Sequence, residues 1–118
     1  MTTDPDEVCE VITTAPDEAW MLDLTRHLVE VRLAACGHHT PIRSIYTWAG
    51  AVHDECETRV ALHTRASCVP AIIAIINDRH PYDVPCVITL PITQAHSGYR
   101  AWILESTTHE SEPPHADL

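Results

Sequence analysis

The 118-residue chain contains no lysine, so its seven basic residues are all arginines. Without lysine it can neither form a Schiff base with a carbonyl substrate nor supply the lysine of a phosphate-binding P-loop. Seventeen Asp and Glu residues give a formal net charge of −10 at pH 7. Because no run of arginines could follow a phosphate backbone, we expect neither nucleic acid nor an anionic membrane as a partner.

The sequence also lacks any apolar run approaching the roughly 18 residues that span a bilayer. Its first residues are acidic where a signal peptide is basic. Its five cysteines are an odd number without regular spacing, which is typical of reduced thiols rather than of a disulfide framework. These features predict a cytoplasmic protein.

The residues that are present indicate one globular domain, with 45% hydrophobic and 20% charged residues. Residues 8–13 are mostly apolar and β-branched, which predicts a first strand. Apolar residues then recur at steps of three and four over 17–35, which predicts a helix about five turns long that Cys36 and Gly37 end. The buried face of this helix is expected to carry Met21, Leu24, Leu28, Val31 and Ala35.

A hairpin is expected next, from strands over 42–48 and 60–64 that are separated by a break at 49–51. A second helix, capped by Ser67 and stopped by His80 and Pro81, is followed by a strand over 87–92 and a short helix over 99–105. The inward face of the second helix is predicted to hold Val69, Ile72, Ile73 and Ile76. The predicted domain covers residues 8–105, with a mobile N-terminus (1–7) and a mobile acidic tail (106–118).

The order β-α-β-β-α-β in one small domain predicts an α+β, ferredoxin-like fold, in which both main helices cover one face of an antiparallel sheet. The other face should carry Ile45, Trp48, Ile88 and Leu90, which is more apolar surface than a solvated sheet face normally shows. We therefore expect subunits to associate through the sheet, which would also close an open edge strand.

Several short segments resemble the CutA family in order and spacing: 14–19, 32–36, 42–48, 64–65, 69–71 and 80–85. The most specific signatures are Ala-Ala-Cys, Ser-Ile-Tyr-x-Trp and His-Pro-Tyr-x-x-Pro, and the match covers roughly residues 8–103. The resemblance implies a ferredoxin-like homotrimer, similar in architecture to PII signalling proteins. It further implies a link to divalent-cation tolerance, with copper binding in some members.

The chain departs from the family pattern in its cleft. Ala49 and Ala51 stand where the family usually has glutamate and lysine around the Trp-x-Gly motif. His63 replaces a lysine of the third strand, and Cys86 replaces a glutamate after the His-Pro-Tyr loop. Members credited with copper ligation use a first-strand cysteine and a pair of histidines. In this chain Thr13 stands at the position of the cysteine and Arg79 at that of one histidine, and only the second histidine, His80, is present. The copper site of those members therefore does not carry over.

The resemblance implies that Cys36, Trp48, His63 and Cys86 line one inter-subunit cleft. Two thiols and an imidazole suit a soft metal, copper or zinc, with Cys36, His63 and Cys86 as ligands. The alternative is an enzyme acting on a small metabolite, with the same three residues as reactive groups. A third hypothesis is a PII-like signalling scaffold that acts through protein contacts.

Other residues qualify as ligand contacts. His80 and Tyr82 are expected at the rim of the cleft, and Trp48 could form an aromatic wall for an organic ligand. Arg65 is the predicted anion contact, because arginine offers a planar fork to carboxylate or phosphate. In an extended segment Cys36 and His38 share a face while the next histidine points away, so two ligands could converge there.

Overall fold

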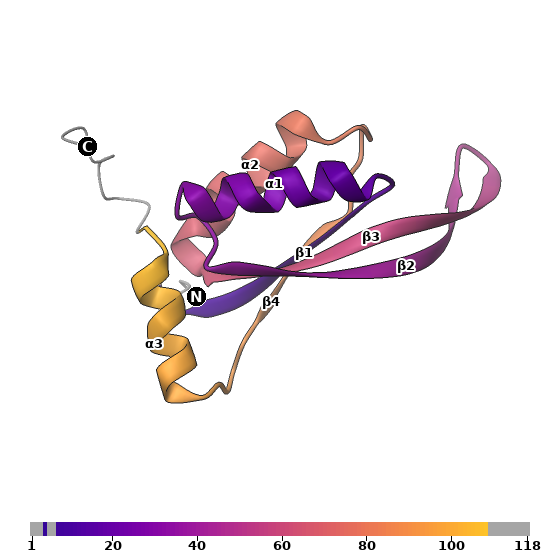
Figure 1. The fold of residues 1–118 in the computed structure, drawn as a ribbon. Coiled ribbons are helices and arrows are strands. Elements are labelled where there is room, and N and C mark those ends of the chain that lie inside the picture. The colour runs from indigo at the N-terminus through magenta and orange to yellow at the C-terminus, as the bar shows by residue number, and fades with distance from the viewer. Residues whose placement is uncertain (1–3, 5–6, 109–118) are drawn as a thin grey trace.

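The computed structural model describes residue 4 and residues 7–108 (Figure 1). The strands are β1 (Val8–Ala15), β2 (Cys36–Trp48), β3 (Ala51–Arg65) and β4 (Val87–Pro91), and the helices are α1 (Glu18–Glu30), α2 (Val69–Arg79) and α3 (Ser97–Ser106). A single 3-10 turn, η1 (Ala66–Cys68), precedes α2.

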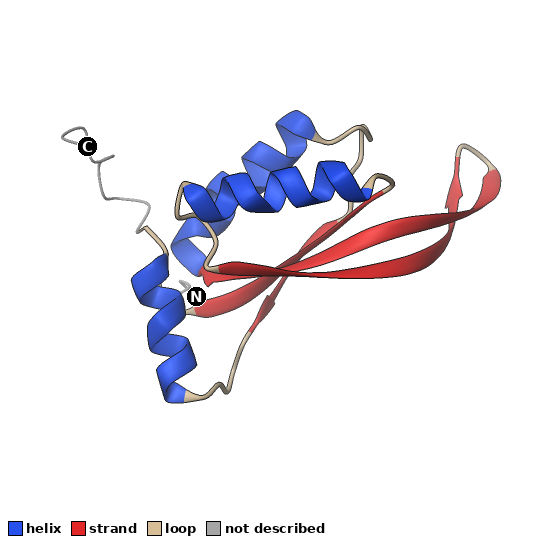
Figure 2. Ribbon diagram, viewed as in Figure 1, coloured by secondary structure: helices blue, strands red, loops and turns tan. Residues whose placement is uncertain are grey.

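The four strands form one antiparallel sheet in the order β2-β3-β1-β4. Helices α1 and α2 both cover one face of this sheet, whereas α3 lies on the other side at one end (Figure 2). This confirms the predicted ferredoxin-like α+β arrangement with a short C-terminal helix. We call the face away from α1 and α2 the open face.

The main core lies between α1, α2 and the sheet. Alternate residues of β1 and β3 point into it, since side chains in a strand alternate between the two faces. Its fully buried members include Val11, Met21, Leu28, Val60, Leu62, Ile72 and Ile76. A smaller cluster of Val8, Ala35 and Ile103 attaches α3 to the open face.

Helix α1 is shorter than predicted. It ends at Glu30 with Val31 as its C-cap, and Arg32 follows in the left-handed region at φ 63°. The amide of Ala35 then donates to the His63 carbonyl, which draws this part of the chain to the sheet. The apolar residues of 31–35 continued the helical period, but Val31, predicted on the buried face, is 44% exposed, and Leu33, Ala34 and Ala35 pack against the core outside the helix. Cys36 and Gly37 begin β2 instead of ending a helix.

The predicted hairpin is confirmed and is longer than expected. Its turn consists of Ala49 and Gly50, both at positive φ (53° and 79°), as a two-residue hairpin turn requires. Residues 53–56, which are mostly polar, also belong to β3, and this end of the hairpin extends beyond α1 and α2 (Figure 1).

Helix α2 starts after η1 without the predicted cap. Its N-cap is Cys68, with no side-chain hydrogen bond, and the Ser67 hydroxyl is buried without a partner. Ile72 and Ile76 face inward as predicted, whereas Ile73 is 40% exposed. His80 follows the helix in an extended conformation, and its amide donates to the Ile76 carbonyl.

The end of α3 is held by hydrogen bonds from other elements. The Arg32 guanidinium donates to the carbonyls of Glu105 and Ser106, and the Thr108 amide donates to the Arg32 carbonyl. Thr107 is buried. The packed domain therefore extends beyond the predicted boundary at 105, and the rest of the predicted tail, 109–118, lies outside the described residues.

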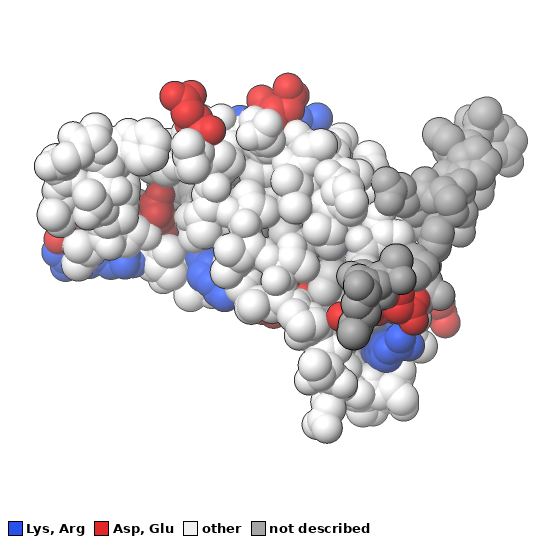
Figure 3. Space-filling model, turned by 180° about the vertical axis from the view of Figure 1, so that it is seen from behind, with Lys and Arg blue, Asp and Glu red and all other residues white. Residues whose placement is uncertain are grey.

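Of the four apolar side chains predicted on the open face, three lie there and are exposed, but Ile45 alternates with them in β2 and lies on the same face as Gly37. In the single chain Trp48, Ile88 and Leu90 are 52%, 51% and 45% exposed. Seen from behind, the molecule carries separate acidic and basic patches, with uncharged surface between them (Figure 3). In the part of the chain that the structure describes, no helix has the length and apolar character needed to cross a membrane.

Candidate metal centre

The start of β2 places two potential ligands on the open face. A Cβ added to Gly37 would meet Thr25, Leu62 and Val60, so this residue faces α1 and the core. Its neighbours Cys36 and His38 must point to the opposite face. The β2–β3 register sets Cys36 directly across from His63, which brings a third potential ligand to the same place.

Cys36, His38 and His63 form one cluster. The cysteine sulfur and one ring nitrogen of each histidine all lie within 4.8 Å of one another. The two imidazole rings meet edge to face, with centroids 5.1 Å apart. His38 is exposed and the other two are partly buried, so the cluster opens to solvent on one side. The prediction that Cys36 and His38 share a face is confirmed.

A carboxylate orients the imidazole of His63. Nε2 of this ring lies 2.9 Å from Oε2 of Glu10 on β1. In the neutral imidazole, Nε2 donates its proton to this carboxylate and Nδ1 keeps its lone pair. The Tyr99 hydroxyl of α3 donates to Nδ1 at 2.6 Å and lies 3.4 Å from the Cys36 sulfur.

Burial raises the pKa of Tyr99 to about 12, and contact with Cys36 and the charge of Glu10 add to this shift. Tyr99 is therefore a protonated phenol at neutral pH, able to donate to His63. Hydrogen bonds therefore connect four groups in series: the Glu10 carboxylate, the His63 imidazole, the Tyr99 phenol and the Cys36 thiol. We call this series the relay. The donor set of one thiolate and two imidazoles fits zinc or monovalent copper.

The structure does not bring Cys86 to this cluster within one chain. Cys86 directly precedes β4, whose Val87 pairs with Thr13, whereas His63 pairs with Glu10. The separation along β1 is three residues, roughly 10 Å, and β4 and β3 lie on opposite sides of β1. His38 takes the place of Cys86 as the third potential ligand.

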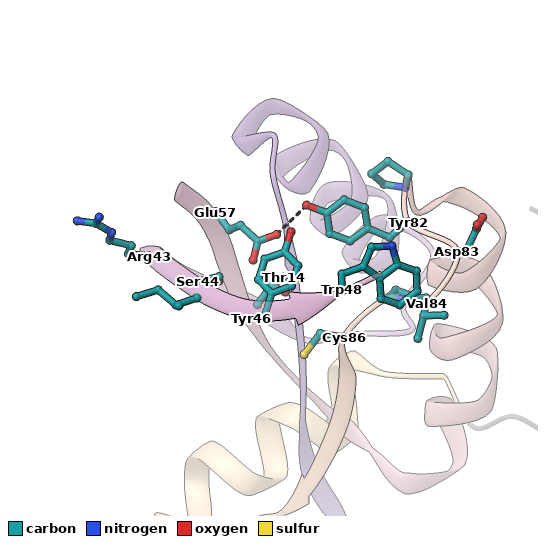
Figure 4. Close-up of a pocket in the computed structure, with 13 residues that line it drawn as sticks. Thr14, Arg43, Ser44, Tyr46, Trp48, Glu57, Tyr82, Asp83, Val84 and Cys86 are labelled. Carbon is teal, nitrogen blue, oxygen red and sulfur yellow. Dashed lines mark hydrogen bonds between the residues drawn. The ribbon is translucent and has the colours of Figure 1, made fainter. Parts of the chain in front are cut away.

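Cys86 instead lines a pocket at the other end of the open face, of about 850 Å³ (Figure 4). Trp48 and Tyr82 line the same pocket, but Cys36 and His63, which were expected in one cleft with Trp48 and Cys86, do not. Further lining residues are Thr14, Arg43, Ser44, Ile45, Tyr46, Glu57, Pro81, Asp83, Val84 and Pro85. The Tyr82 hydroxyl donates to Oε2 of Glu57 at 3.0 Å. Burial raises the pKa of Tyr82, and this hydrogen bond makes a further, smaller contribution in the same direction.

His80 and Arg65 hold elements together and are not among the residues lining the pocket. Nδ1 of His80 accepts from the Tyr82 amide (3.0 Å), so its Nε2 carries a proton and donates to the Thr14 carbonyl (2.8 Å). His80 thus fixes the loop against β1. The Arg65 guanidinium donates to the Thr107 hydroxyl and the Leu104 carbonyl, which occupies the predicted anion contact with the end of α3.

Sequence reasoning missed three residues of the centre: Glu10 and Tyr99 altogether, and His38 as the partner of His63. The signal for Glu10 was a lone acid in an otherwise apolar strand, opposite the third strand in any ferredoxin-like sheet. No local signal could have placed Tyr99, because its position depends on how α3 packs across the sheet.

The sequence matches the family description "CutA1 divalent ion tolerance protein" over residues 9–106. It is 36% identical over 109 residues to human Protein CutA, covering 92% of this chain and 61% of that protein, so the chain spans about three fifths of the human relative. The Divalent-cation tolerance protein CutA of Salmonella newport is 36% identical, over 82% of this chain and 85% of its own length.

Among solved structures, the divalent cation tolerance protein (Cut A1) from Thermus thermophilus superposes with a TM-score of 0.82 at 33% identity. The superposition covers 86% of this chain and 99% of the Thermus chain.

Proposed function

This chain belongs to the CutA1 divalent ion tolerance family, and on that premise we propose that it binds a soft metal ion at Cys36, His38 and His63 as its part in metal tolerance. The single observation that carries the proposal is the convergence of these three donors within 4.8 Å. One sulfur and two nitrogens match the ligands that zinc and monovalent copper prefer, and they leave a fourth position for an exchangeable ligand.

The surroundings of His63 support the same function. Histidines that bind metals usually donate their second ring N–H to a carboxylate, which fixes the tautomer and makes the ligating nitrogen more basic. Glu10 has this relation to His63. The Tyr99 hydroxyl occupies the lone pair of Nδ1, so metal binding requires this phenol to move aside.

We further propose that the protein acts as a cytoplasmic homotrimer. The exposed apolar side chains of the open face support association through the sheet. In such an assembly the open face of one subunit meets its partners, so the thiol of Cys86 from a neighbour could approach the cluster, as the family resemblance implies.

The test is metal binding by purified protein and matched cysteine variants. Equilibrium dialysis with Zn²⁺, followed by elemental analysis, should give one ion per chain. Replacing a ligand, as in Cys36→Ser or His38→Ala, should abolish stoichiometric binding, whereas Cys56→Ser on the exposed hairpin should leave it unchanged. Glu10→Gln should weaken the affinity roughly 10- to 100-fold, because it orients a ligand without touching the ion.

Cys86→Ser separates the two possible ligand sets. Unchanged binding in this variant supports the cluster Cys36, His38 and His63, and loss of binding supports the set with Cys86 that the family resemblance suggests. The absence of any stoichiometric zinc or copper in the unsubstituted protein would contradict the function as a whole.

A second candidate function, catalysis on a small metabolite, is supported by the relay from Glu10 through His63 and Tyr99 to Cys36. Such a relay can accept the proton of a nucleophilic thiol. This function requires Cys36 to react with iodoacetamide at neutral pH faster than the exposed Cys56, and His63→Gln to remove the difference. Equal rates would exclude it.

A further inference from the structure

We propose that the pocket beside the loop from Pro81 to Cys86 binds a small organic cation, an alkylammonium or guanidinium group, through Glu57 and the surrounding aromatic rings. This pocket lies at the opposite end of the open face from the cluster of Cys36, His38 and His63, and it shares no residue with it. The inference therefore concerns a second site, and it does not depend on metal binding.

Glu57 is the residue that gives the pocket its chemistry. It lines the pocket while being only 7% exposed. Within residues 7–108 the one hydrogen-bond partner of its carboxylate is the Tyr82 hydroxyl, and the carboxylate forms no ion pair. A buried carboxylate is costly unless a positive charge or further hydrogen bonds compensate it. A cation entering the pocket would supply that compensation.

The arginine that lines the pocket is already neutralised. Nε and Nη2 of Arg43 donate to the two carboxylate oxygens of Asp54, each at 2.8 Å, which is a bidentate ion pair. The other charged lining residues are Glu57 and Asp83, both acidic. The uncompensated charge of the lining is therefore negative, which favours cations and disfavours carboxylates and phosphates.

Aromatic side chains complete the site. Tyr46, Trp48 and Tyr82 all line the pocket, with the two tyrosines beside the Glu57 carboxylate (Figure 4). The electron-rich faces of such rings attract ammonium and guanidinium groups, and tryptophan does so most strongly. Carboxylate and aromatic faces together are the chemistry that recognises organic cations.

The remaining features fit a small molecule better than a metal ion. A volume of about 850 Å³ lies within the usual range of small-molecule sites, roughly 300–1,000 Å³. In the described part of the chain, three potential metal ligands come together at Cys36, His38 and His63, and none of these residues lines the pocket. Apolar lining from Ile45, Val84 and the two prolines would cover the alkyl part of the ligand.

The test is an NMR titration with three probes that share one alkyl chain: pentylammonium, 1-pentanol and pentanoate. The indole N–H of Trp48 reports on the pocket, and those of Trp20 and Trp102 serve as internal controls, because neither lines it. We expect the Trp48 signal to shift selectively, with pentylammonium binding about tenfold more tightly than pentanol and pentanoate more weakly than both.

Glu57→Gln tests the residue that carries the proposal. The glutamine amide keeps an acceptor for Tyr82 but removes the charge, so the preference for pentylammonium over pentanol should disappear. Glu30→Gln, at the exposed end of α1, makes the same change in net charge and should leave the preference intact.

Two results would overturn the proposal: equal affinity for pentylammonium and pentanol in the unsubstituted protein, or an unchanged preference in Glu57→Gln. A Trp48 signal that responds to no probe would also overturn it. Repeating the titration with Cys36→Ser should give the same preference, which separates this site from the metal centre.

Discussion

His63 shows how the position of one side chain can determine the chemistry of a site. On β3 its neighbours Leu62 and Thr64 point into the core, so His63 itself points to the open face. There Glu10 takes one ring nitrogen and Tyr99 the other, and Cys36 lies directly across the strand pair. A shift of this residue by one position along β3 would point the imidazole into the core, and the three donor groups would no longer lie together.

At the residue scale, Cys9 makes the stability of the protein sensitive to alkaline pH. Burial, with smaller contributions from Glu7 and Cys68, raises the pKa of this thiol from 9.0 to about 11. Between these values the unfolded chain loses a proton that the folded chain keeps, so the free energy of unfolding falls as pH rises. The stabilising contribution is complete below pH 9 and lost by about pH 11.

Cys9→Ala should therefore flatten the decline in urea midpoint between pH 9 and 11. Cys56→Ala, which removes an exposed thiol, should keep the slope of the unsubstituted protein. Parallel slopes for all three proteins would show that the buried thiol does not titrate as described.

His80 is a second single residue with a measurable structural role. Its imidazole bridges the Tyr82 amide and the Thr14 carbonyl, which joins the pocket loop to β1. His80→Ala should lower the free energy of unfolding by about 2–3 kcal/mol, because it leaves polar groups unpaired. Arg79→Ala, an exposed neighbour, should cost less than about 0.5 kcal/mol. Equal urea midpoints for the two variants would refute this role.

At the scale of elements, the spacing of apolar residues predicted the order of strands and helices, but it did not predict all of the residues at which they begin and end. The apolar residues after Glu30 continued the period of α1, yet the left-handed turn at Arg32 leads the chain to the sheet. The far half of the hairpin was missed because residues 53–57 of β3 are mostly polar, so its alternating burial leaves no alternating hydrophobic pattern in the sequence. The candidate centre was predicted in part, since Cys36 and His63 belong to it, but the contribution of Glu10 and Tyr99 required the register and the packing of α3.

The close approach of α1 to β2 depends on Gly37. A Cβ at this position would lie 2.5 Å from Cγ2 of Thr25 and 3.1 Å from side-chain atoms of Leu62 and Val60. Gly37→Ala should therefore lower the free energy of unfolding by about 1–3 kcal/mol, measured in urea.

Gly50→Asn is the matched control for this substitution. Gly50 has a positive φ of 79° but open space around it, and asparagine tolerates the left-handed region. It should be nearly neutral. A stable Gly37→Ala variant would mean that α1 can shift away from the sheet without cost.

At the scale of the whole molecule, the open face accounts for the expected assembly. Light scattering should find three copies of the chain, the number that the family resemblance implies, because Ile88 and its apolar neighbours are exposed in one chain and association would bury them. Ile88→Glu should shift the measured mass toward that of a single chain. Leu22→Glu on α1, at a comparably exposed site, should leave the mass unchanged. A single-chain mass for the unsubstituted protein would contradict the proposed trimer.

X-ray absorption of the zinc-loaded protein tests the proposed function most directly, because it reports the atoms bound to the metal. With Cys36, His38 and His63 as ligands, the spectrum should contain one sulfur near ~2.3 Å and two imidazole nitrogens near ~2.0 Å. In Cys86→Ser the sulfur should persist, whereas any zinc that Cys36→Ser still retains in excess metal should show no sulfur ligand. A first shell of oxygen alone, or a sulfur that survives Cys36→Ser, would contradict the account.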